Sequence, residues 1–165
     1  QNEATKHADM FVTFLDANRV LVAQVDARRD PINAAILDRN AQQLQRLQLT
    51  GARGKSLQVH RFPVPTREGT YWSPYTNIIM ANRLVLMPTF ESDDQRIVQN
   101  AIATYRRLLP GYEVRTIDMT SMKALQGSLH CLSLNLPAGA PWPRTFYSFQ
   151  NSLRSLRSAT QHSQK

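Results

Sequence analysis

The pattern of apolar and polar residues repeats along this chain. Residues 17–22 (ANRVLV) and 81–86 (ANRLVL) are nearly the same and lie 64 positions apart. In each copy a short polar turn separates two β-rich runs, over residues 11–25 and 77–88, which is the pattern of a β-hairpin. The sequence therefore predicts two hairpins of similar build.

A helical spacing of apolar residues follows each hairpin. The first helix is expected to begin at Pro31, which suits a first helical position, and to end near Gly51. The second is expected to begin near Asp93 and Asp94, whose charges suit the positive end of a helix dipole, and to end at residues 109–111. Each helix is expected to lead into a further strand.

The strands after the helices are predicted over residues 57–62 and 112–117, so the repeating unit is β-β-α-β. Complete units are expected at about 11–64 and 75–120, and a β-type run over 128–136 is expected to open a third. This order predicts an α/β (α+β) fold built from ββαβ repeats. Because each unit in an array covers its neighbour's apolar face, about two and a half units should leave such faces open to self-association or to another chain.

The last segment has a different composition. Residues 138–165 are basic and rich in Ser and Arg, with no compact turn and strand pattern, and a mobile tail is predicted there. The spacing of Phe146, Phe149, Leu153 and Leu156 leaves one amphipathic helix as the alternative.

Composition narrows the class of protein. The chain has 165 residues, of which 42% are hydrophobic, enough for one domain with a buried core. A net charge of +8 raises the question of a polyanionic partner, but the cations are dispersed, so a solvated basic surface is favoured over a nucleic-acid site. No apolar run reaches the length of about 20 residues that spans a bilayer, and no leader pattern is present. A soluble protein is expected, with a cytoplasmic location favoured, although the cysteine count does not decide the compartment.

Candidate chemistry centres on the single cysteine, Cys131, within residues 127–133 (GSLHCLS). A thiol together with a histidine and an aspartate is the set that cysteine-nucleophile chemistry requires, and His7 and Asp9 are the candidate partners. An inert core cysteine is the competing interpretation, since free cysteine packs as a small hydrophobic residue.

Four segments in order carry a family resemblance: residues 5–11 (TKHADMF), 75–88 (YTNIIMANRLVLMP), 109–114 (LPGYEV) and 127–131 (GSLHC). They resemble the agmatine deiminase and bacterial-type (Porphyromonas-type) peptidylarginine deiminase family. The resemblance covers about residues 5–137 and corresponds to the C-terminal half of such enzymes. It implies a pentein-like propeller, a ring of ββαβ modules around a central active site, which agrees with the repeat found in the sequence.

The resemblance also implies roles for individual residues. Cys131 would be the nucleophile, His7 the general acid and base, and Asp9 a carboxylate that binds the guanidinium group. His7 and Asp9, two apart at the start of a predicted strand, should point to one face. Asn77 is expected either to lie near the substrate or to cap the backbone, and His130 to point away from Cys131 as a structural hydrogen-bonding residue. No metal and no cofactor is implied.

The departures from the family pattern are specific. The family's N-terminal half carries a Trp-x-Arg-Asp-x-Gly-Pro segment whose aspartate is a second guanidinium ligand, and residues 1–165 contain nothing similar. Lys6 and Gln126 occupy positions where relatives often have Gly. At Lys6 the change would matter if the backbone φ were positive there.

Two classes of function therefore remain open. The first is half of a guanidine-modifying hydrolase that acts on a guanidine-bearing small molecule or peptidyl-arginine and needs an N-terminal half in cis or in trans. The isolated chain would then be inactive. The second is a non-catalytic interaction module with the same fold, and an amidinotransferase, which uses an amine in place of water, is a further alternative. A homo-oligomer is an expected partner state, whereas membrane and nucleic acid are not expected partners.

Overall fold

The computed structural model describes residues 5–47, 56–67, 69, 71–125, 127–136 and 139. Residues 1–134 form one compact unit, to which the description below applies, and residues 135–165 are assigned to a second. The predictions that concern Gly51, Gln126 and the amphipathic tail helix fall outside the described residues.

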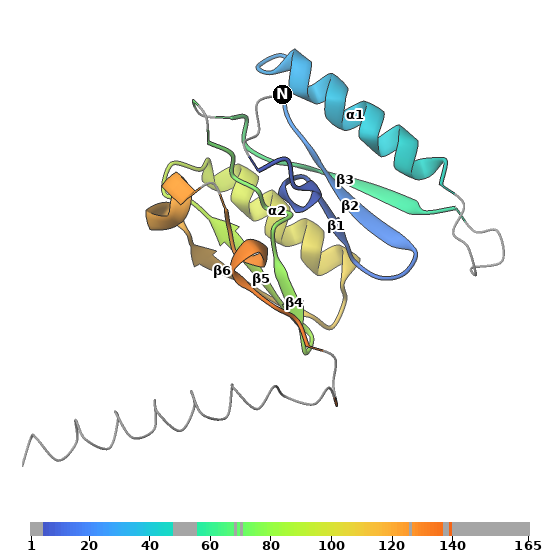
Figure 1. The fold of residues 1–165 in the computed structure, drawn as a ribbon, viewed down its shortest axis with the longest axis vertical. Coiled ribbons are helices and arrows are strands. Elements are labelled where there is room, and N and C mark those ends of the chain that lie inside the picture. Colours follow the sequence, from blue (N-terminus) through green and yellow to red (C-terminus); the bar gives the residue numbers. More distant parts are fainter. Residues whose placement is uncertain are drawn as a thin grey trace, which may run out of the picture. The chain divides into compact units, whose positions relative to one another are not determined.

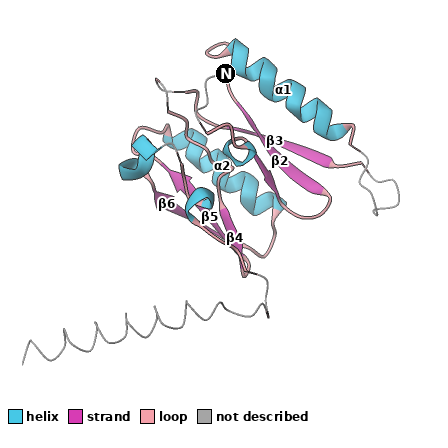
Figure 2. Ribbon diagram, viewed as in Figure 1, coloured by secondary structure: helices cyan, strands magenta, loops and turns pink. Residues whose placement is uncertain are grey.

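The first ββαβ module follows a short 3-10 helix, η1 (Ala8–Met10). Strand β1 (Val12–Phe14) pairs antiparallel with β2 (Arg19–Gln24), helix α1 spans Pro31–Gln45, and β3 (Gln58–Pro63) returns parallel to β2. The sheet order is β1-β2-β3. The predicted hairpin, helix and strand of the first repeat are all present (Figure 2).

The second module has the same order and pairing. Strand β4 (Ile79–Ala81) pairs antiparallel with β5 (Leu84–Thr89), helix α2 spans Gln95–Leu108, and β6 (Glu113–Asp118) runs parallel to β5. Its sheet order is β4-β5-β6. Two further 3-10 helices follow, η2 (Thr120–Leu125) and η3 (His130–Leu132). The structure thus confirms the mixed α/β class and the two complete repeats.

The two hairpin turns differ although their sequences are alike. Asn82 and Arg83 both have positive φ, 51° and 60°, as a two-residue type I′ turn between antiparallel strands requires. In the first copy the Asp16 carboxylate instead accepts the backbone N–H groups of Asn18 and Arg19. The Asp16 carboxylate therefore stabilises a longer loop, although the Ala-Asn-Arg sequence is the same in both copies.

Both helices begin at a side-chain cap. The Asp30 carboxylate accepts the N–H of Asn33, and Pro31 occupies the first helical position. The Asp94 carboxylate accepts the N–H of Arg96 at the start of α2. These contacts satisfy donors that a helix start leaves unpaired.

Helix α2 lies between the two sheets (Figure 1). Its Tyr105 ring is fully buried and meets the ring of Phe62 on β3 edge to face, with centroids 5.6 Å apart. Such an aromatic pair adds about 1 kcal/mol beyond the buried area. Because one core cluster contains side chains from both modules, the modules pack as a single unit rather than as separate domains.

The predicted third strand is wrong. Residues 130–132 form η3, and residues 133–136 form no strand. The Asn77 side-chain oxygen accepts the N–H groups of His130 and Cys131, while the N–H of Leu132 bonds to the carbonyl of Leu129. These donors are therefore already satisfied and are not available to a neighbouring strand. No helix in the described part of the chain is long and apolar enough to cross a membrane.

Candidate active site

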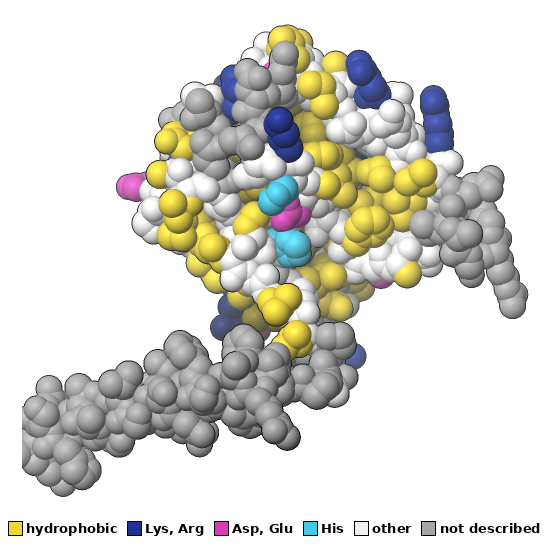
Figure 3. All heavy atoms as spheres, in the orientation of Figure 1, with side chains coloured by type: hydrophobic (Ala, Val, Ile, Leu, Met, Phe, Trp, Pro, Cys, Tyr) yellow, Lys and Arg dark blue, Asp and Glu magenta, His cyan; other side chains and the backbone are white. Residues whose placement is uncertain are grey.

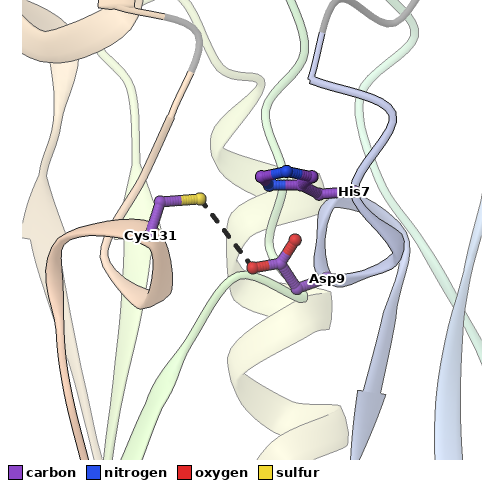
Figure 4. A group of neighbouring side chains, drawn as sticks. All are labelled: His7, Asp9 and Cys131. Atoms are coloured by element: carbon purple, nitrogen blue, oxygen red, sulfur yellow. Dashed lines mark hydrogen bonds between the residues drawn. The ribbon is translucent and has the colours of Figure 1, made fainter.

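Three segments far apart in sequence meet at one site: the turn at η1, the residues before β4, and η3. The turn at η1 carries His7 and Asp9, and η3 carries Cys131. One ligand-type atom from each of these side chains lies within 4.8 Å of the others. Figure 4 shows the sulfur facing the Asp9 carboxylate, with the His7 imidazole beside both. The structure therefore brings all three sequence-predicted residues together.

The Asp9 carboxylate is the centre of the group. Its Oδ2 atom accepts the Cys131 thiol at 3.8 Å and lies 2.7 Å from Nδ1 of His130. Its Oδ1 atom is buried and has no hydrogen-bond partner among the described residues. The side chain as a whole is 23% exposed, so the carboxylate is reachable yet partly desolvated. On the face shown in Figure 3, histidine side chains flank an acidic one.

Two neighbouring residues hold the two sides of the site. The Thr76 hydroxyl donates to the backbone carbonyl of Asp9 at 3.0 Å. The next residue, Asn77, donates its side-chain N–H to the sulfur of Cys131 at 3.3 Å. Both residues are buried, with exposures of 1% and 0%. Residues 76 and 77 therefore connect the η1 turn to η3.

A buried carboxylate, that of Asp93, also holds the segment of residues 73–77 in place. Asp93 accepts hydrogen bonds from the hydroxyls of Ser73 (2.6 Å) and Tyr75 (2.7 Å) and from the N–H of Phe90 (3.0 Å). Burial, together with the neighbouring Asp93 carboxylate, raises the pKa of the Tyr75 phenol above its ordinary value. Tyr105 donates to the Tyr75 carbonyl at 2.8 Å. Residues 73–77 are thus held by Asp93, which lies just before α2, and by Tyr105 of α2.

The local geometry differs from the sequence prediction in two respects. His7 and Asp9 are not in a strand: His7 precedes the 3-10 helix that contains Asp9. His130 does not point away from the site, since its ring and the Cys131 sulfur both contact Asp9 Oδ2. Both predictions assumed strand alternation, whereas a 3-10 turn can bring neighbouring side chains to one side.

Lys6 has φ of +56°, so the backbone at this position is left-handed, which is the condition under which a lysine in place of glycine would matter. Sequence reasoning did not identify Thr76 or Asp93 as parts of the site. The run of polar residues just before β4 was the available signal, because polar side chains that pack inside a core are normally hydrogen-bonded.

Nitrogen, oxygen and sulfur donors at this spacing support more than one chemistry. A histidine beside a thiol can transfer protons to and from it and its substrate, and a carboxylate can bind a cation. The same His7, Asp9 and Cys131 atoms are also of the types that bind Zn²⁺.

The fold of the chain is similar to that of solved pentein-fold deiminases. The chain matches a Porphyromonas gingivalis protein, provisionally named an arginine deiminase, with 26% identity and a TM-score of 0.66 over 81% of this chain and 39% of that one. The agmatine deiminase of Enterococcus faecalis shares the fold, with a TM-score of 0.57 and 18% identity over 75% of this chain and 38% of that one. The two ββαβ modules are therefore part of a pentein fold.

Comparison of the sequence with known families identifies the family of this chain. Residues 1–137 match the Porphyromonas-type peptidyl-arginine deiminase family, and the chain belongs to it. An agmatine deiminase of Pseudomonas fluorescens (strain SBW25) is 26% identical over 159 residues, which cover 83% of this chain and 42% of the relative. A Legionella pneumophila (strain Philadelphia 1) protein, provisionally named an agmatine deiminase, is 28% identical over 82% of this chain and 39% of its own length. The chain thus spans about two fifths of the curated relatives it matches.

Proposed function

We propose that this chain supplies the Cys-His-Asp portion of the active site of a deiminase, a hydrolase that converts a guanidine group to a ureido group and releases ammonia. The observation that carries the proposal is the meeting of His7, Asp9 and Cys131 within 4.8 Å. Membership of a deiminase family, and relatives named agmatine deiminase, support the reaction class.

In the first step the guanidinium cation is bound by the Asp9 carboxylate through charge-assisted hydrogen bonds. The thiolate of Cys131 adds to the guanidinium carbon and forms a carbon–sulfur bond. His7 in its protonated form gives its proton to the departing nitrogen, the carbon–nitrogen bond breaks, and ammonia leaves. The substrate remains attached to the sulfur as a thiouronium.

In the second step water attacks the thiouronium carbon. His7, now neutral, accepts a proton from the water, and the carbon–sulfur bond breaks to return the thiolate. The product then loses its extra proton, which the released ammonia takes up as ammonium, and the neutral ureido group is left. One water is consumed and one ammonia is released in each cycle. A histidine suits both steps because its ordinary pKa lies near neutrality. The hydrogen bond from His130 would keep the Asp9 carboxylate turned toward the substrate cation.

The proposed substrates are agmatine and peptidyl-arginine, which share the guanidinium group that this site would bind. A second carboxylate, carried in the N-terminal portion of the family, would complete the guanidinium site. The active form therefore contains that portion, in cis or in trans.

Cys131→Ser, placed in a protein that also contains the N-terminal portion of the family, tests the proposal. Ammonia release from agmatine and from peptidyl-arginine should be abolished, because serine lacks the nucleophilic thiolate. Leu132→Ala, at an exposed neighbour in the same turn, is the matched control and should retain activity. Retained turnover in Cys131→Ser would exclude the covalent mechanism.

A further inference from the structure

A cavity of about 120 Å³ lies between helix α1 and the segment that leads from β3 to β4. The end of η1 and the following residue close it on a third side. Apolar side chains make up most of its lining, and they are Met10, Phe11, Ile36, Leu37, Val64 and Trp72. None of the three reactive residues of the candidate active site lines this cavity, so it is a separate feature of the described unit.

The polar side chains that line the cavity are two amides and one hydroxyl, and two of these three already have partners. The Ser73 hydroxyl donates to the Asp93 carboxylate at 2.6 Å, and the Asn33 amide donates to the Asp30 carboxylate at 2.7 Å. Among the described residues, no Lys, Arg, Asp, Glu or His lines the cavity. Because burial of an unpaired charge is unfavourable, this lining excludes a charged ligand such as a guanidinium and favours an uncharged apolar one.

The size of the cavity and its position at the surface limit the ligand further. Apolar cavities of this order stay free of water and take up small apolar molecules, and one of roughly 150 Å³ binds benzene. Ile36 and Trp72 are only partly buried, so the cavity reaches the surface and a ligand has a path of entry. The rings of Phe11 and Trp72 offer aromatic surface against which a ring can pack.

The walls of the cavity belong to segments that also hold the candidate active site. Met10 follows Asp9 in η1. Ser73 begins the segment in which Thr76 donates a hydrogen bond to the Asp9 carbonyl. A ligand in the cavity would therefore contact both segments without occupying the guanidinium site.

We propose that this cavity is a binding site for a small, uncharged, apolar molecule of about the size of benzene. The proposal goes beyond the deiminase reaction and does not depend on it. Binding would remove apolar surface of the ligand and of the cavity walls from water, which is the favourable term in such an association.

Benzene is the probe for the test, and Trp72 is the reporter. The chain has two tryptophans, so Trp142→Phe leaves Trp72 as the only one. In that background, benzene should change the fluorescence of Trp72 in a saturable way. At about ten times the resulting Kd, benzene should also raise the Tm by about 4 °C, because it binds the folded chain. Benzoate, which adds a charge to the same ring, should do neither.

Ile36→Asp places a charge at the partly buried edge of the cavity and should weaken the binding of benzene at least about tenfold. Ile32→Asp is the matched control, because it makes the same change on the same helix at a side chain that is 58% exposed and outside the cavity. It should bind benzene as the unaltered chain does. An Ile36→Asp protein that keeps its thermal unfolding transition and binds benzene equally well would overturn the proposal.

A second measurement needs no substitution. In the chain with ¹³C-labelled methyl groups, the methyl signals of Met10, Leu37 and Val64 should shift on addition of benzene, with the same Kd as the fluorescence change. Methyl signals that stay unchanged up to the solubility limit of benzene would also overturn the proposal. Neither measurement requires turnover, so failure here is distinguishable from failure of the deiminase reaction, which ammonia release tests.

Discussion

Individual polar residues hold this site in place through several hydrogen bonds each. Asn77 uses both ends of its amide on η3, and Asp93 accepts three donors inside the core. A buried acceptor with three donors is stable where a partly satisfied one is not. The residues beside the reactive groups are therefore as constrained as the reactive groups themselves.

The free energy of unfolding should depend on pH because the phenols of Tyr75 and Tyr105 are buried. Burial raises the pKa of Tyr75 and of Tyr105, and the Asp93 carboxylate adds to the effect at Tyr75. Above pH of about 10 the unfolded chain loses these protons while the folded chain keeps them, so the free energy of unfolding falls as pH rises. Each phenol should contribute about 1.4 kcal/mol per pH unit in that range.

Urea unfolding, repeated at pH values from about 9 to about 11 in steps of about one unit, measures this slope. Tyr105→Phe should reduce it by the share of one phenol. A slope that Tyr105→Phe does not alter would contradict the assignment.

The turns between strands show how one sequence pattern supports two local structures. The second hairpin places Arg83 at φ of 60°, a conformation that costs about 1 kcal/mol for a residue other than glycine. In the first hairpin the Asp16 carboxylate satisfies the loop N–H groups. The two modules have the same order of elements although their turns are stabilised by different means.

Arg83→Gly should raise the free energy of unfolding by about 0.5 kcal/mol, since glycine adopts positive φ without steric cost. Ala103→Gly, at an exposed position inside α2, should lower it by about 1 kcal/mol. Chemical denaturation of both variants checks the opposite signs. Destabilisation by both would show that the turn is not strained by its arginine.

At the scale of the molecule, the described unit is two modules of a pentein fold that share α2 as a common core helix. The chain spans about two fifths of its curated relatives, and the proposed active form includes a second guanidinium carboxylate from the family's N-terminal portion. Loss of one charge partner for a bound cation costs several kcal/mol, and about 3 kcal/mol weakens binding more than a hundredfold.

We therefore expect the 165-residue chain alone to release no measurable ammonia from agmatine or peptidyl-arginine. Addition of the N-terminal portion of the family, as a separate chain or fused to this one, should restore release. The same mixture with Cys131→Ser is the negative control. Appreciable turnover by the chain alone would show that this half of the fold is sufficient.

The sequence by itself determined the order of elements. The repeated ANR motif, Pro31, the aspartates before α2 and the helical spacing predict both ββαβ modules, because hairpins and helix starts depend on residues close together in the chain. The same local signals failed at residues 128–136. There the residues favour a strand, but the hydrogen bond to Asn77, a residue more than fifty positions earlier, stabilises a 3-10 turn instead.

Only the tertiary structure decided the geometry of the site. The contact between Asn77 and Cys131 joins residues 54 positions apart, and that between His130 and Asp9 joins residues 121 apart. Strand periodicity placed His130 on the far side of Cys131, whereas the 3-10 turn directs both side chains at one carboxylate oxygen. Such contacts depend on how the two modules pack around α2, and no local pattern of residues encodes that packing.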